Sequence, residues 1–350
     1  MGAGCCKADD AHPISMTHGR RIVPFQLDSS RDHQKELTEL TLTENTLNNN
    51  LISWQRGDLV GEGVYGKVYQ AMNLITGELL AVKSYKLNHD GEIAQKELIS
   101  IKRELKILKS LDHPNIIKYF QVDYEGNTNT IDILTEYVPS GSMLNLLQKY
   151  RVFSESVIRN YTKQLLDGLD YLHSNEVIHR DLKSANILIT EDSTLKLTDF
   201  GCSRRFDSNV SSQSKSFKGS PYWMSPEMVT NTGHSYPSDI WSLGCLVIEM
   251  ASGRPPWSNY SKFSKDVLRL IAKPGNMPDM PRVSPSLMDF ISRCLQRDPE
   301  KRATAKELLA HEFITVAPPA KCYDSIRTST NNLSVNNSHN GKITDLKKEL

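Results

Sequence analysis

Four polar residues in the middle of the chain have the types and the order that phosphoryl transfer requires. Asp181, Lys183 and Asn186 share one short segment between two apolar runs, and Asp199 follows a little further on. A carboxylate can orient a hydroxyl group, and a lysine can contact the phosphoryl group that is transferred. An amide and a second carboxylate supply the oxygen ligands that Mg²⁺ prefers, beside water and phosphate. These residues therefore predict a phosphoryl-transfer site.

Three glycines indicate where the phosphates of a nucleotide would lie. Gly61, Gly63 and Gly66 allow a hairpin to lie flat over an anion, because no Cβ separates the backbone N–H groups from it. The same spacing opens dinucleotide-binding folds, in which a helix should follow directly. Strand-like sequence continues here through Val68 and Tyr69, which favours a glycine-rich hairpin. An ordinary glycine hairpin is the alternative that these residues alone leave open.

A lysine on the next strand has a partner in the sequence. Lys83 would be half-buried within its strand, so its ammonium group needs an anion nearby. Glu104, on the helix predicted next, can supply that anion and leave the ammonium group over the nucleotide phosphates. The alternative is that both are solvated surface charges, as most Lys and Glu residues are. The spacing from the glycines favours the functional interpretation.

The elements that must position these residues change in kind along the chain. One helix is predicted over the apolar repeat from Ile93 to Leu108, and the pattern is helical after Pro139. Residues 239–251 are apolar nearly all round, which is typical of a helix at the centre of a lobe. Strands first and helices afterwards predict an α+β enzyme with a cleft between two unlike lobes. The predicted strands cover residues 57–69, 79–87, 115–122 and 131–138.

Length and composition exclude several classes of protein. The chain has 350 residues, 24% of them charged, and a formal net charge of +1. This balance lacks the basic excess of nucleic-acid-binding proteins, so no nucleic-acid partner is expected. No run approaches the roughly eighteen apolar residues of a membrane span, and a secretory signal is not expected. Six cysteines without paired CxxC spacing favour a reducing, cytoplasmic location.

The two ends of the chain differ from its middle. Residues 1–52 are predicted to form a flexible arm, and residues 316–350 an Asn/Ser-rich disordered tail. Neither has enough large apolar side chains to offset the entropy lost on ordering. The region 53–315 would form the catalytic domain, with lobes at about 53–138 and 139–315.

The N-terminal arm begins with a sequence that resembles a lipidation site. Gly2 would be myristoylated once Met1 is removed, and Cys5 and Cys6 would be palmitoylated. A second acyl chain makes a marginal membrane anchor stable. The sixth position departs from the motif, which prefers Ser or Thr there, so an unmodified polar arm is the alternative.

The segment from Trp54 to about Ile314 resembles a eukaryotic protein kinase catalytic domain. The resemblance implies a bilobal fold, with a small, mainly antiparallel β-sheet lobe that carries one helix and a larger helical lobe. It rests on the glycine-rich loop, the Ala-Val-Lys strand, Glu104, the His-Arg-Asp motif at 179–181, the Asp-Phe-Gly motif at 199–201, Ser225-Pro226-Glu227, Asp239 and Arg302.

The resemblance also implies roles for individual residues. Asp181 would be the catalytic base, Lys183 the γ-phosphate contact, Asn186 and Asp199 the Mg²⁺ ligands, and Lys83–Glu104 the activating ion pair. Glu227 would pair with Arg302 as a buried structural bridge, and Asp239 would support the backbone of the His-Arg-Asp motif.

An ATP site is implied between the lobes. Thr135 would stand at the back of the adenine pocket as the gatekeeper, and its small side chain predicts access for bulky inhibitors. The other residues implied for ATP are Val60, Gly61, Glu62, Gly63, Val64, Tyr65, Gly66 and Lys67 from the glycine-rich loop, Val68 and Ala81 above the adenine, Leu188 below it, Lys83, and the backbone groups of Glu136 and Val138.

Further detail resembles one group of these enzymes. Lys183 in His-Arg-Asp-Leu-Lys-Ser-Ala-Asn and the segment 219–223 have the serine/threonine form, although Ser220 and Ser225 replace a more usual threonine and alanine. Several segments, among them residues 77–83, 113–119 and 136–143, resemble MAP kinase kinase kinases of the MEKK/NPK kind, which implies MAP kinase kinases as substrates. Germinal-centre and PAK-type kinases share much of this pattern. A pseudokinase scaffold is a further alternative, although every catalytic group is present.

The segment between Asp199 and Glu227 has the composition of a regulatory loop. It contains five serines between residues 206 and 218 and little apolar sequence. A phosphoserine would bring negative charge and acceptor oxygens that Arg180 could bind. Ser216 is the predicted site, because it lies three residues before Gly219, where related kinases place an activating hydroxyl. A flexible polar loop without such a role is the alternative.

Overall fold

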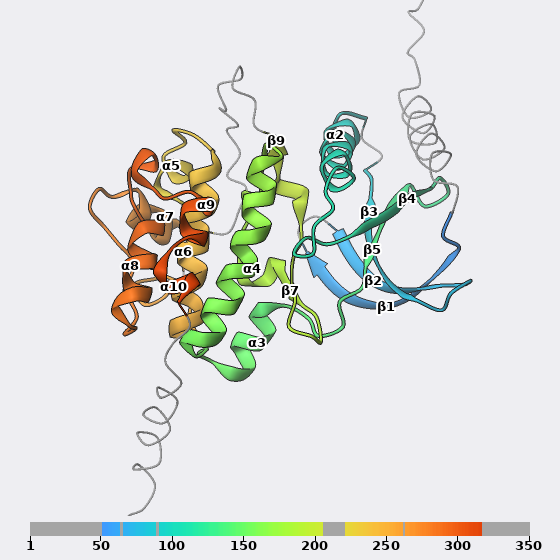
Figure 1. Cartoon of the computed structure of the whole chain (residues 1–350). Coiled ribbons are helices and arrows are strands. Elements are labelled where there is room, and N and C mark those ends of the chain that lie inside the picture. Colours follow the sequence, from blue (N-terminus) through green and yellow to red (C-terminus); the bar gives the residue numbers. More distant parts are fainter. Residues whose placement is uncertain (1–50, 64–65, 89–90, 206–220, 262, 317–350) are drawn as a thin grey trace, which may run out of the picture.

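Strands fill the first part of the chain and helices the second, and they form two lobes of unlike composition (Figure 1). The computed structural model describes residues 51–63, 66–88, 91–205, 221–261 and 263–316. The arm with Gly2, Cys5 and Cys6, the loop residues Val64 and Tyr65, Ser216 and Ser220, and the predicted tail from residue 317 onward lie outside the described residues. The α+β, bilobal fold class predicted from the sequence is confirmed.

The smaller lobe is an antiparallel sheet with the strand order β1-β2-β3-β5-β4. Its outer face is closed by a small apolar cluster of Ala71, Leu80, Val82 and Leu134, which alternate with residues of the opposite face. This alternation leaves Lys83 on the inner face, toward the helix α2 (Gly91–Leu108). The strands are β1 (Trp54–Gly63), β2 (Gly66–Asn73), β3 (Leu79–Lys86), β4 (Tyr119–Glu125) and β5 (Thr130–Glu136).

One predicted strand begins later than the sequence pattern indicated. The strand expected from residue 115 is β4, which starts at Tyr119. Residues 115–117 bond to the other lobe instead: the Ile117 N–H donates to the Leu197 carbonyl at 3.0 Å, and the Leu197 N–H donates to the Asn115 carbonyl at 2.9 Å. Extended backbone with apolar side chains looks the same in either lobe, so periodicity could not separate the two pairings.

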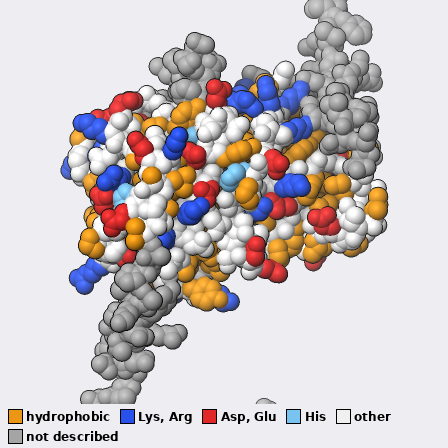
Figure 2. All heavy atoms as spheres, viewed as in Figure 1, with side chains coloured by type: hydrophobic (Ala, Val, Ile, Leu, Met, Phe, Trp, Pro, Cys, Tyr) orange, Lys and Arg blue, Asp and Glu red, His pale blue; other side chains and the backbone are white. Residues whose placement is uncertain are grey.

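The helix of the smaller lobe is α2 (Gly91–Leu108), which confirms the helix predicted there. Its apolar residues, among them Leu98, Ile101 and Leu105, are buried in the main core. Its outer side is basic. Figure 2 shows side chains of both signs interspersed over much of one face of the molecule, with basic side chains gathered over α2.

The larger lobe is helical, and short strands and 3-10 turns carry its loops. Two two-stranded pairs, β6 with β9 and β7 with β8, bracket the loops that contain Asp181 and Asp199. The helices are α3 (Met143–Tyr150), α4 (Glu155–Ser174), α5 (Pro226–Val229), α6 (Tyr236–Ser252), α7 (Ser264–Ala272), α8 (Pro285–Cys294), α9 (Ala305–Leu309) and α10 (Glu312–Thr315). The short elements are β6 (Val177–Ile178), η1 (Ser184–Asn186), β7 (Ile187–Ile189), β8 (Leu195–Leu197), η2 (Phe200–Cys202), β9 (Arg204–Arg205), η3 (Pro221–Trp223) and η4 (Pro299–Lys301).

The centre of the larger lobe is α6, as the apolar sequence of residues 239–251 predicted. It begins after Ser235, which forms a capping box, and ends at Gly253, whose φ of 72° is left-handed. A Cβ on Gly244 would lie 2.7 Å from Cβ of Cys294 on α8, so the two helices require a glycine where they approach.

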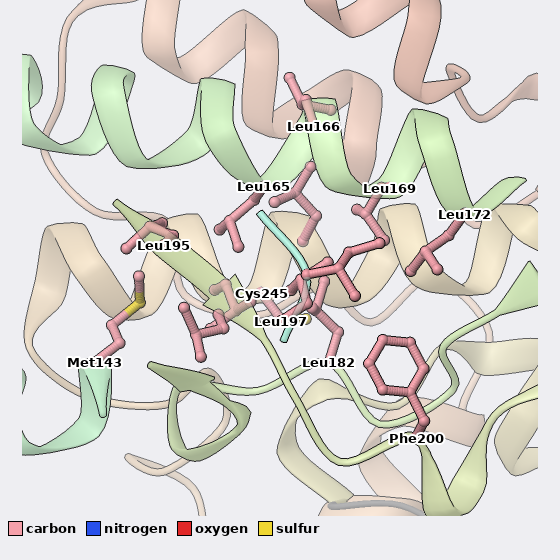
Figure 3. Packing of buried hydrophobic residues seen from close by; sticks show 14 of the residues in the cluster. Met143, Leu165, Leu166, Leu169, Leu172, Leu182, Leu195, Leu197, Phe200 and Cys245 are labelled. Atoms are coloured by element: carbon pink, nitrogen blue, oxygen red, sulfur yellow. The ribbon is translucent and has the colours of Figure 1, made fainter. Parts of the chain in front are cut away.

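The loops of the site rest directly on this core. Figure 3 shows leucines of α4, among them Leu165 and Leu169, directed toward Leu182, Leu197 and Phe200. All five are at most 1% exposed, and burying such a side chain stabilises the fold by about 1.5–3 kcal/mol. Because Leu182 and Phe200 adjoin Asp181 and Asp199, the core fixes both loops. No helix in the described part of the chain is long and apolar enough to span a membrane.

Candidate active site

The loop that carries Asp181 is held by a carboxylate from the central helix. Asp239 on α6 accepts hydrogen bonds from the backbone N–H groups of His179 and Arg180, both at 2.9 Å. His173 Nε2 lies 3.0 Å from the same carboxylate. Burial opposes the ionisation of Asp239, but its hydrogen bonds and the neighbouring histidines hold its pKa below the usual value. Asp239 is therefore a positioning residue for this loop, as the resemblance implied.

Three predicted residues meet within the loop. Lys183 Nζ lies 2.7 Å from Asp181 Oδ2. The side-chain amide of Asn186 donates to the backbone carbonyl of Asp181 at 2.8 Å and to Asp181 Oδ2 at 3.0 Å. Asp181 and Asn186 are nearly buried, at 5% and 6% exposure. These bonds fix the direction of the Asp181 carboxylate.

A second loop brings Asp199 beside the first. The Thr198 N–H donates to the Asn186 carbonyl at 3.0 Å, and His179 Nε2 lies 3.0 Å from the Thr198 carbonyl. Asp199 itself has left-handed backbone angles, φ 63° and ψ 67°, and Phe200 follows it into the core. Left-handed backbone is uncommon outside glycine and recurs at functional sites, where the surroundings hold it. The bonds of Thr198 thus join the two loops at the residue next to Asp199.

Lys83 connects this second loop to the helix of the smaller lobe. Its Nζ lies 2.9 Å from Glu104 Oε1 and 2.8 Å from Asp199 Oδ1. Burial lowers the pKa of Lys83, but Glu104, Tyr85 and Asp199 together raise it well above the usual value. Burial raises the pKa of Asp199, but Lys83, together with His179 and Lys183, holds it below the usual value. The predicted Lys83–Glu104 pair is confirmed, and the bond to Asp199 extends it across the cleft.

Tyr85 belongs to this cluster and was missed in the sequence. Its hydroxyl donates to Glu104 Oε2 at 2.7 Å, and Lys83 Nζ lies 5.2 Å from the centre of its ring. Residues two apart on a strand share a face, so the position of Lys83 already indicated that Tyr85 would lie beside it. Glu104 therefore has a partner on each oxygen.

The glycine-rich loop joins β1 and β2, and most of the residues predicted for it lie at that turn. Gly61, Glu62 and Gly63 end β1, and Gly66, Lys67 and Val68 belong to β2, while Val60 lies within β1. Gly66 has φ 146°, and a Cβ there would lie 2.6 Å from the Ser84 carbonyl oxygen. Glycine is therefore required at this point, where the loop passes over β3.

The residues predicted around adenine lie on three strands and the connection between the lobes. Ala81 on β3 pairs with Thr135 on β5, and Leu188 lies on β7. Glu136 ends β5, and its carboxylate bonds Lys196 of the other lobe at 2.9 Å. Val138 is buried in the connection itself.

A cavity of about 750 Å³ opens between the glycine-rich hairpin, β3 and α2. Glu62, Lys67, Tyr85 and Glu104 are among the residues that line it, whereas Ala81, Thr135 and Leu188 are not. It therefore lies on the Glu104 side of the cleft and not at the predicted adenine pocket.

The family model described as the protein kinase domain matches residues 54–314. The chain belongs to the protein kinase family. The glycines of this kinase therefore open a hairpin between two strands, and the dinucleotide-binding alternative is excluded.

The kinase is similar to several curated proteins named as MAP kinase kinase kinases. Mitogen-activated protein kinase kinase kinase A of Dictyostelium discoideum is 44% identical over 275 residues, which are 77% of this chain and 29% of the relative. Mitogen-activated protein kinase kinase kinase 2 of Arabidopsis thaliana is 44% identical over 268 residues, 75% of this chain and 41% of the relative. The kinase ANP1 of Arabidopsis thaliana is 42% identical over 287 residues, 81% of this chain and 43% of the relative. The chain thus spans less than half the length of these relatives.

A buried ion pair joins α5 to the segment that follows η4 in the larger lobe. Arg302 donates to Glu227 through Nη1 at 2.6 Å and Nη2 at 3.1 Å, and to the carbonyls of Pro237 at 2.6 Å and Gln296 at 2.9 Å. Burial raises the pKa of Glu227, but the bonds and charge of Arg302 hold it below the usual value. The predicted bridge between Glu227 and Arg302 is confirmed.

The donor set of this kinase fits a Mg²⁺ ion. Asn186 turns its amide N–H₂ toward Asp181, and its carbonyl oxygen is the atom that would meet a cation. Asp199 contacts Lys83 through Oδ1 and offers Oδ2 as a second oxygen ligand. No group of three or more His, Cys, Asp or Glu side chains suited to a metal occurs within the described ranges. An ion held by one amide, one carboxylate and substrate phosphates agrees with this, because Mg²⁺ often has few protein ligands.

Cationic groups gather where β9 leads out of the described chain. Arg180 is 8% exposed. Burial is the main reason that the pKa of Arg180 is lowered, and the neighbouring Arg204 and Arg103 act in the same direction. His234 lies near these arginines, and burial followed by the charge of Arg180 lowers its pKa to about 4. A cluster of this sign favours an anion beside Arg180.

Proposed function

We propose that this chain is an ATP-dependent serine/threonine kinase that phosphorylates MAP kinase kinases. The observation that carries the proposal is the joint placement of Asp181, Lys183, Asn186, Asp199 and Lys83 on two bonded loops and one strand. The similarity to proteins named as MAP kinase kinase kinases supports the substrate class. The Lys183 loop, in its serine/threonine form, supports the acceptor residue.

Each side chain has a defined task in this proposal. Asp181 orients the substrate hydroxyl and accepts its proton, and its bonds to Lys183 and Asn186 hold the carboxylate in position. Lys183 and Lys83 place positive charge beside the transferred phosphoryl group and the phosphates of ATP. Mg²⁺ held by Asn186 and Asp199 would supply further neutralisation of phosphate charge. Catalysis is then mainly positioning and electrostatic stabilisation.

The test is phosphate transfer by the full chain. Purified protein with Mg²⁺-ATP is given a catalytically inactive MAP kinase kinase, and a generic basic protein serves as a second acceptor. Phosphoserine or phosphothreonine should form on the MAP kinase kinase, and Asp181→Asn should lower the rate by about 10²–10⁴-fold. Preference for the generic acceptor would favour a germinal-centre or PAK-type kinase. No transfer to either acceptor, nor to the enzyme itself, would favour the pseudokinase scaffold.

We also propose that phosphorylation of Ser216 activates this kinase. The cations around Arg180 support this, since a phosphoserine bound there would connect the order of residues 206–220 to the loop of Asp181. Ser216→Ala should lower activity severely and leave the melting temperature unchanged. Full activity, with phosphate mapped to Ser208, Ser211, Ser212 or Ser214, would assign the role to another serine.

A membrane address is proposed for the N-terminal arm. Acylation of Gly2, Cys5 and Cys6 would place part of the protein at membranes, because two or more acyl chains are needed for stable anchoring. Gly2→Ala should move this fraction into the cytoplasm. Identical partitioning of both forms in cell fractionation would contradict the proposal.

A further inference from the structure

The outward side of α2 carries a row of cations. From Gln95 to Ser110, just beyond the end of the helix, the sequence has five basic residues and two acidic ones. At 3.6 residues per turn the five cations lie within an arc of about 140°, and Glu97 and Glu104 lie outside that arc. Glu97 bonds the side chain of Asn88, and Glu104 bonds Lys83. We call this surface the α2 ridge, and its cations are Lys96, Lys102, Arg103, Lys106 and Lys109.

The α2 ridge is accessible and continues beyond the helix. Four of its five cations are exposed, and Lys102 is half-buried. Ile99, in the middle of the ridge, is 50% exposed. Arg205 of β9 donates to the hydroxyl of Ser110 at 3.0 Å, which adds a sixth cation beside the ridge. Figure 2 shows basic side chains gathered over this part of the molecule. A patch of one sign around an exposed apolar side chain is typical of an interaction surface.

The needs of the helix itself account for only part of this charge. Cations stabilise the macrodipole of a helix within its last turn, and the last turn of α2 contains Lys106 alone. Lys109 packs over the ring of Tyr119, with its Nζ 5.6 Å from the ring centre. The other three cations of the ridge lie before the last turn. Their number and common direction favour an anionic partner outside the chain.

The shape of the α2 ridge favours a flat partner. The cavity beside α2 is lined by Ser100, Ile101 and Glu104, whereas Arg103 and Lys106 are not among its lining residues. The ridge is thus the convex outer side of a helix, which can lie against a bilayer but does not enclose a peptide.

We propose that the α2 ridge binds the surface of membranes that contain anionic phospholipids. Clusters of four to eight Lys and Arg residues on a helix suit such a surface, since each cation near it raises the affinity about fivefold. The cations would contact lipid phosphates and carboxylates through their long side chains, and Ile99 would enter the headgroup region.

This inference goes beyond the phosphoryl transfer proposed for the chain, and it extends the membrane address proposed for the N-terminal arm. The described chain begins at Leu51 on the smaller lobe, which also carries α2 (Figure 1). An acyl chain on Gly2 would therefore hold the lobe with the ridge close to the bilayer. One acyl chain binds a membrane only marginally, and a basic patch is one of the second signals that make the binding stable.

Two neutralising substitutions test the ridge against a matched control. Lys102→Gln with Lys106→Gln removes two charges one helical turn apart, and glutamine favours a helix about as well as lysine. The control is Lys149→Gln with Lys306→Gln, two exposed positions of the larger lobe. Each pair removes two positive charges, so net charge alone cannot distinguish them. Both double variants should keep the melting temperature of the wild type.

The measurement is sedimentation of the full-length chain, produced without acylation, with vesicles of phosphatidylcholine that contain about 30% phosphatidylserine. The wild type and the control should bind these vesicles but not vesicles of phosphatidylcholine alone. Binding should weaken when the salt concentration rises from about 0.1 to about 1 M, because salt screens the charges. The partition coefficient of Lys102→Gln with Lys106→Gln should be about 20- to 30-fold lower than that of the wild type, at about fivefold per charge.

Equal binding by the two double variants, or no binding by the wild type, overturns the proposal. An acidic segment of the arm is the competing occupant, because residues 36–50 contain Glu36, Glu39 and Glu44 and no Lys or Arg. If the chain binds vesicles only after these three glutamates are changed to Gln, the arm covers the ridge and the proposal fails. Binding of the unacylated chain requires neither a lipid on Gly2 nor phosphate transfer. Failure of the proposed acylation or of the proposed kinase activity is therefore distinguishable from failure of the ridge.

Discussion

Lys83 and Arg302 each meet a buried glutamate, but the lysine lies between the two lobes and the arginine lies inside one of them. The Lys83 side chain keeps 19% exposure and divides its contacts between Glu104 and Asp199, which come from different lobes. The Arg302 side chain is fully buried and binds Glu227 with two nitrogens. Two backbone carbonyls complete the arginine's bonds.

The difference follows from the chemistry of the two cations. A lysine is a compact charge with rotatable donors, so it can exchange one anion for another without rearranging the backbone. The planar guanidinium of arginine fits a carboxylate in one orientation and fixes the segments that carry the two groups. A pair built for partner exchange should affect activity when broken, and a pair built for fixation should affect folding.

The largest effect is expected from Arg302→Leu. Loss of the guanidinium leaves the Glu227 carboxylate buried without its partner, which should lower the free energy of unfolding by about 3–5 kcal/mol. Urea denaturation followed by circular dichroism measures this. The double variant with Glu227→Leu should recover most of the loss, because no unpaired charge remains. A single variant as stable as the wild type would show that the pair does not hold the lobe.

Lys83→Met should show the opposite pattern. Phosphate transfer to a protein substrate should fall by about 10²–10³-fold, since one preorganised cation is lost from the reacting phosphates. Stability should change by no more than about 1–2 kcal/mol, because Tyr85 still donates to Glu104 and the carboxylates can take up a proton. Initial rates and urea denaturation of the same preparation compare the two effects. If Lys83→Met unfolds as readily as Arg302→Leu, the two ion pairs do not differ in their contribution to folding.

Acid should weaken the fixed pair in a defined pH range. The pKa of Glu227 is held below its usual value of 4.5, so its contribution to stability is present above pH 4.5 and is lost as the pH falls through the lowered value. The wild type should therefore lose more unfolding free energy between pH 6 and acid pH than the double variant lacking Glu227 and Arg302. Parallel pH profiles of the two proteins would argue against the pair as the source.

The smallest effect concerns the adenine pocket. Thr135→Met adds volume behind the site predicted for adenine, so inhibitors with a bulky group in that direction should lose about tenfold in affinity. KM for ATP should stay within about twofold, because ATP does not reach that space. Inhibition constants and KM measured on both proteins test this. Equal losses for ATP and inhibitor would contradict the placement of Thr135.

Much of the fold was readable because strands and helices leave different periods in the sequence. The strand predicted over residues 79–87 and the helical repeat from Ile93 to Leu108 match β3 and α2 closely. Residues 115–117 were misassigned to β4, since an extended segment does not record which lobe supplies its hydrogen-bond partner.

The site was readable where residues act through a motif, and unreadable where they act through packing. Glu104 and Arg302 stand at positions that the resemblance assigns, and both meet the predicted partners. Tyr85 carries no motif. The strand alternation places it on the same face as Lys83, but its bond to Glu104 depends on how α2 packs against β3, which the sequence does not record.

The contacts of residues 112–117 fix the C-terminal end of α2 and leave its N-terminal end away from the helical lobe. The Asp112 N–H donates to the Tyr171 hydroxyl on α4 at 3.0 Å, and His113 stacks on the same ring. Together with the bonds of Ile117 to β8, these contacts anchor the C-terminal end of α2 to the helical lobe. At a rise of 1.5 Å per residue, Glu104 lies about 6 Å along the helix from its anchored end at Leu108, and Gly91 lies about 26 Å from that end. A rotation of α2 about this end would therefore move Gly91 about four times as far as Glu104, so a large displacement at the surface would change the position of the glutamate beside Lys83 only slightly.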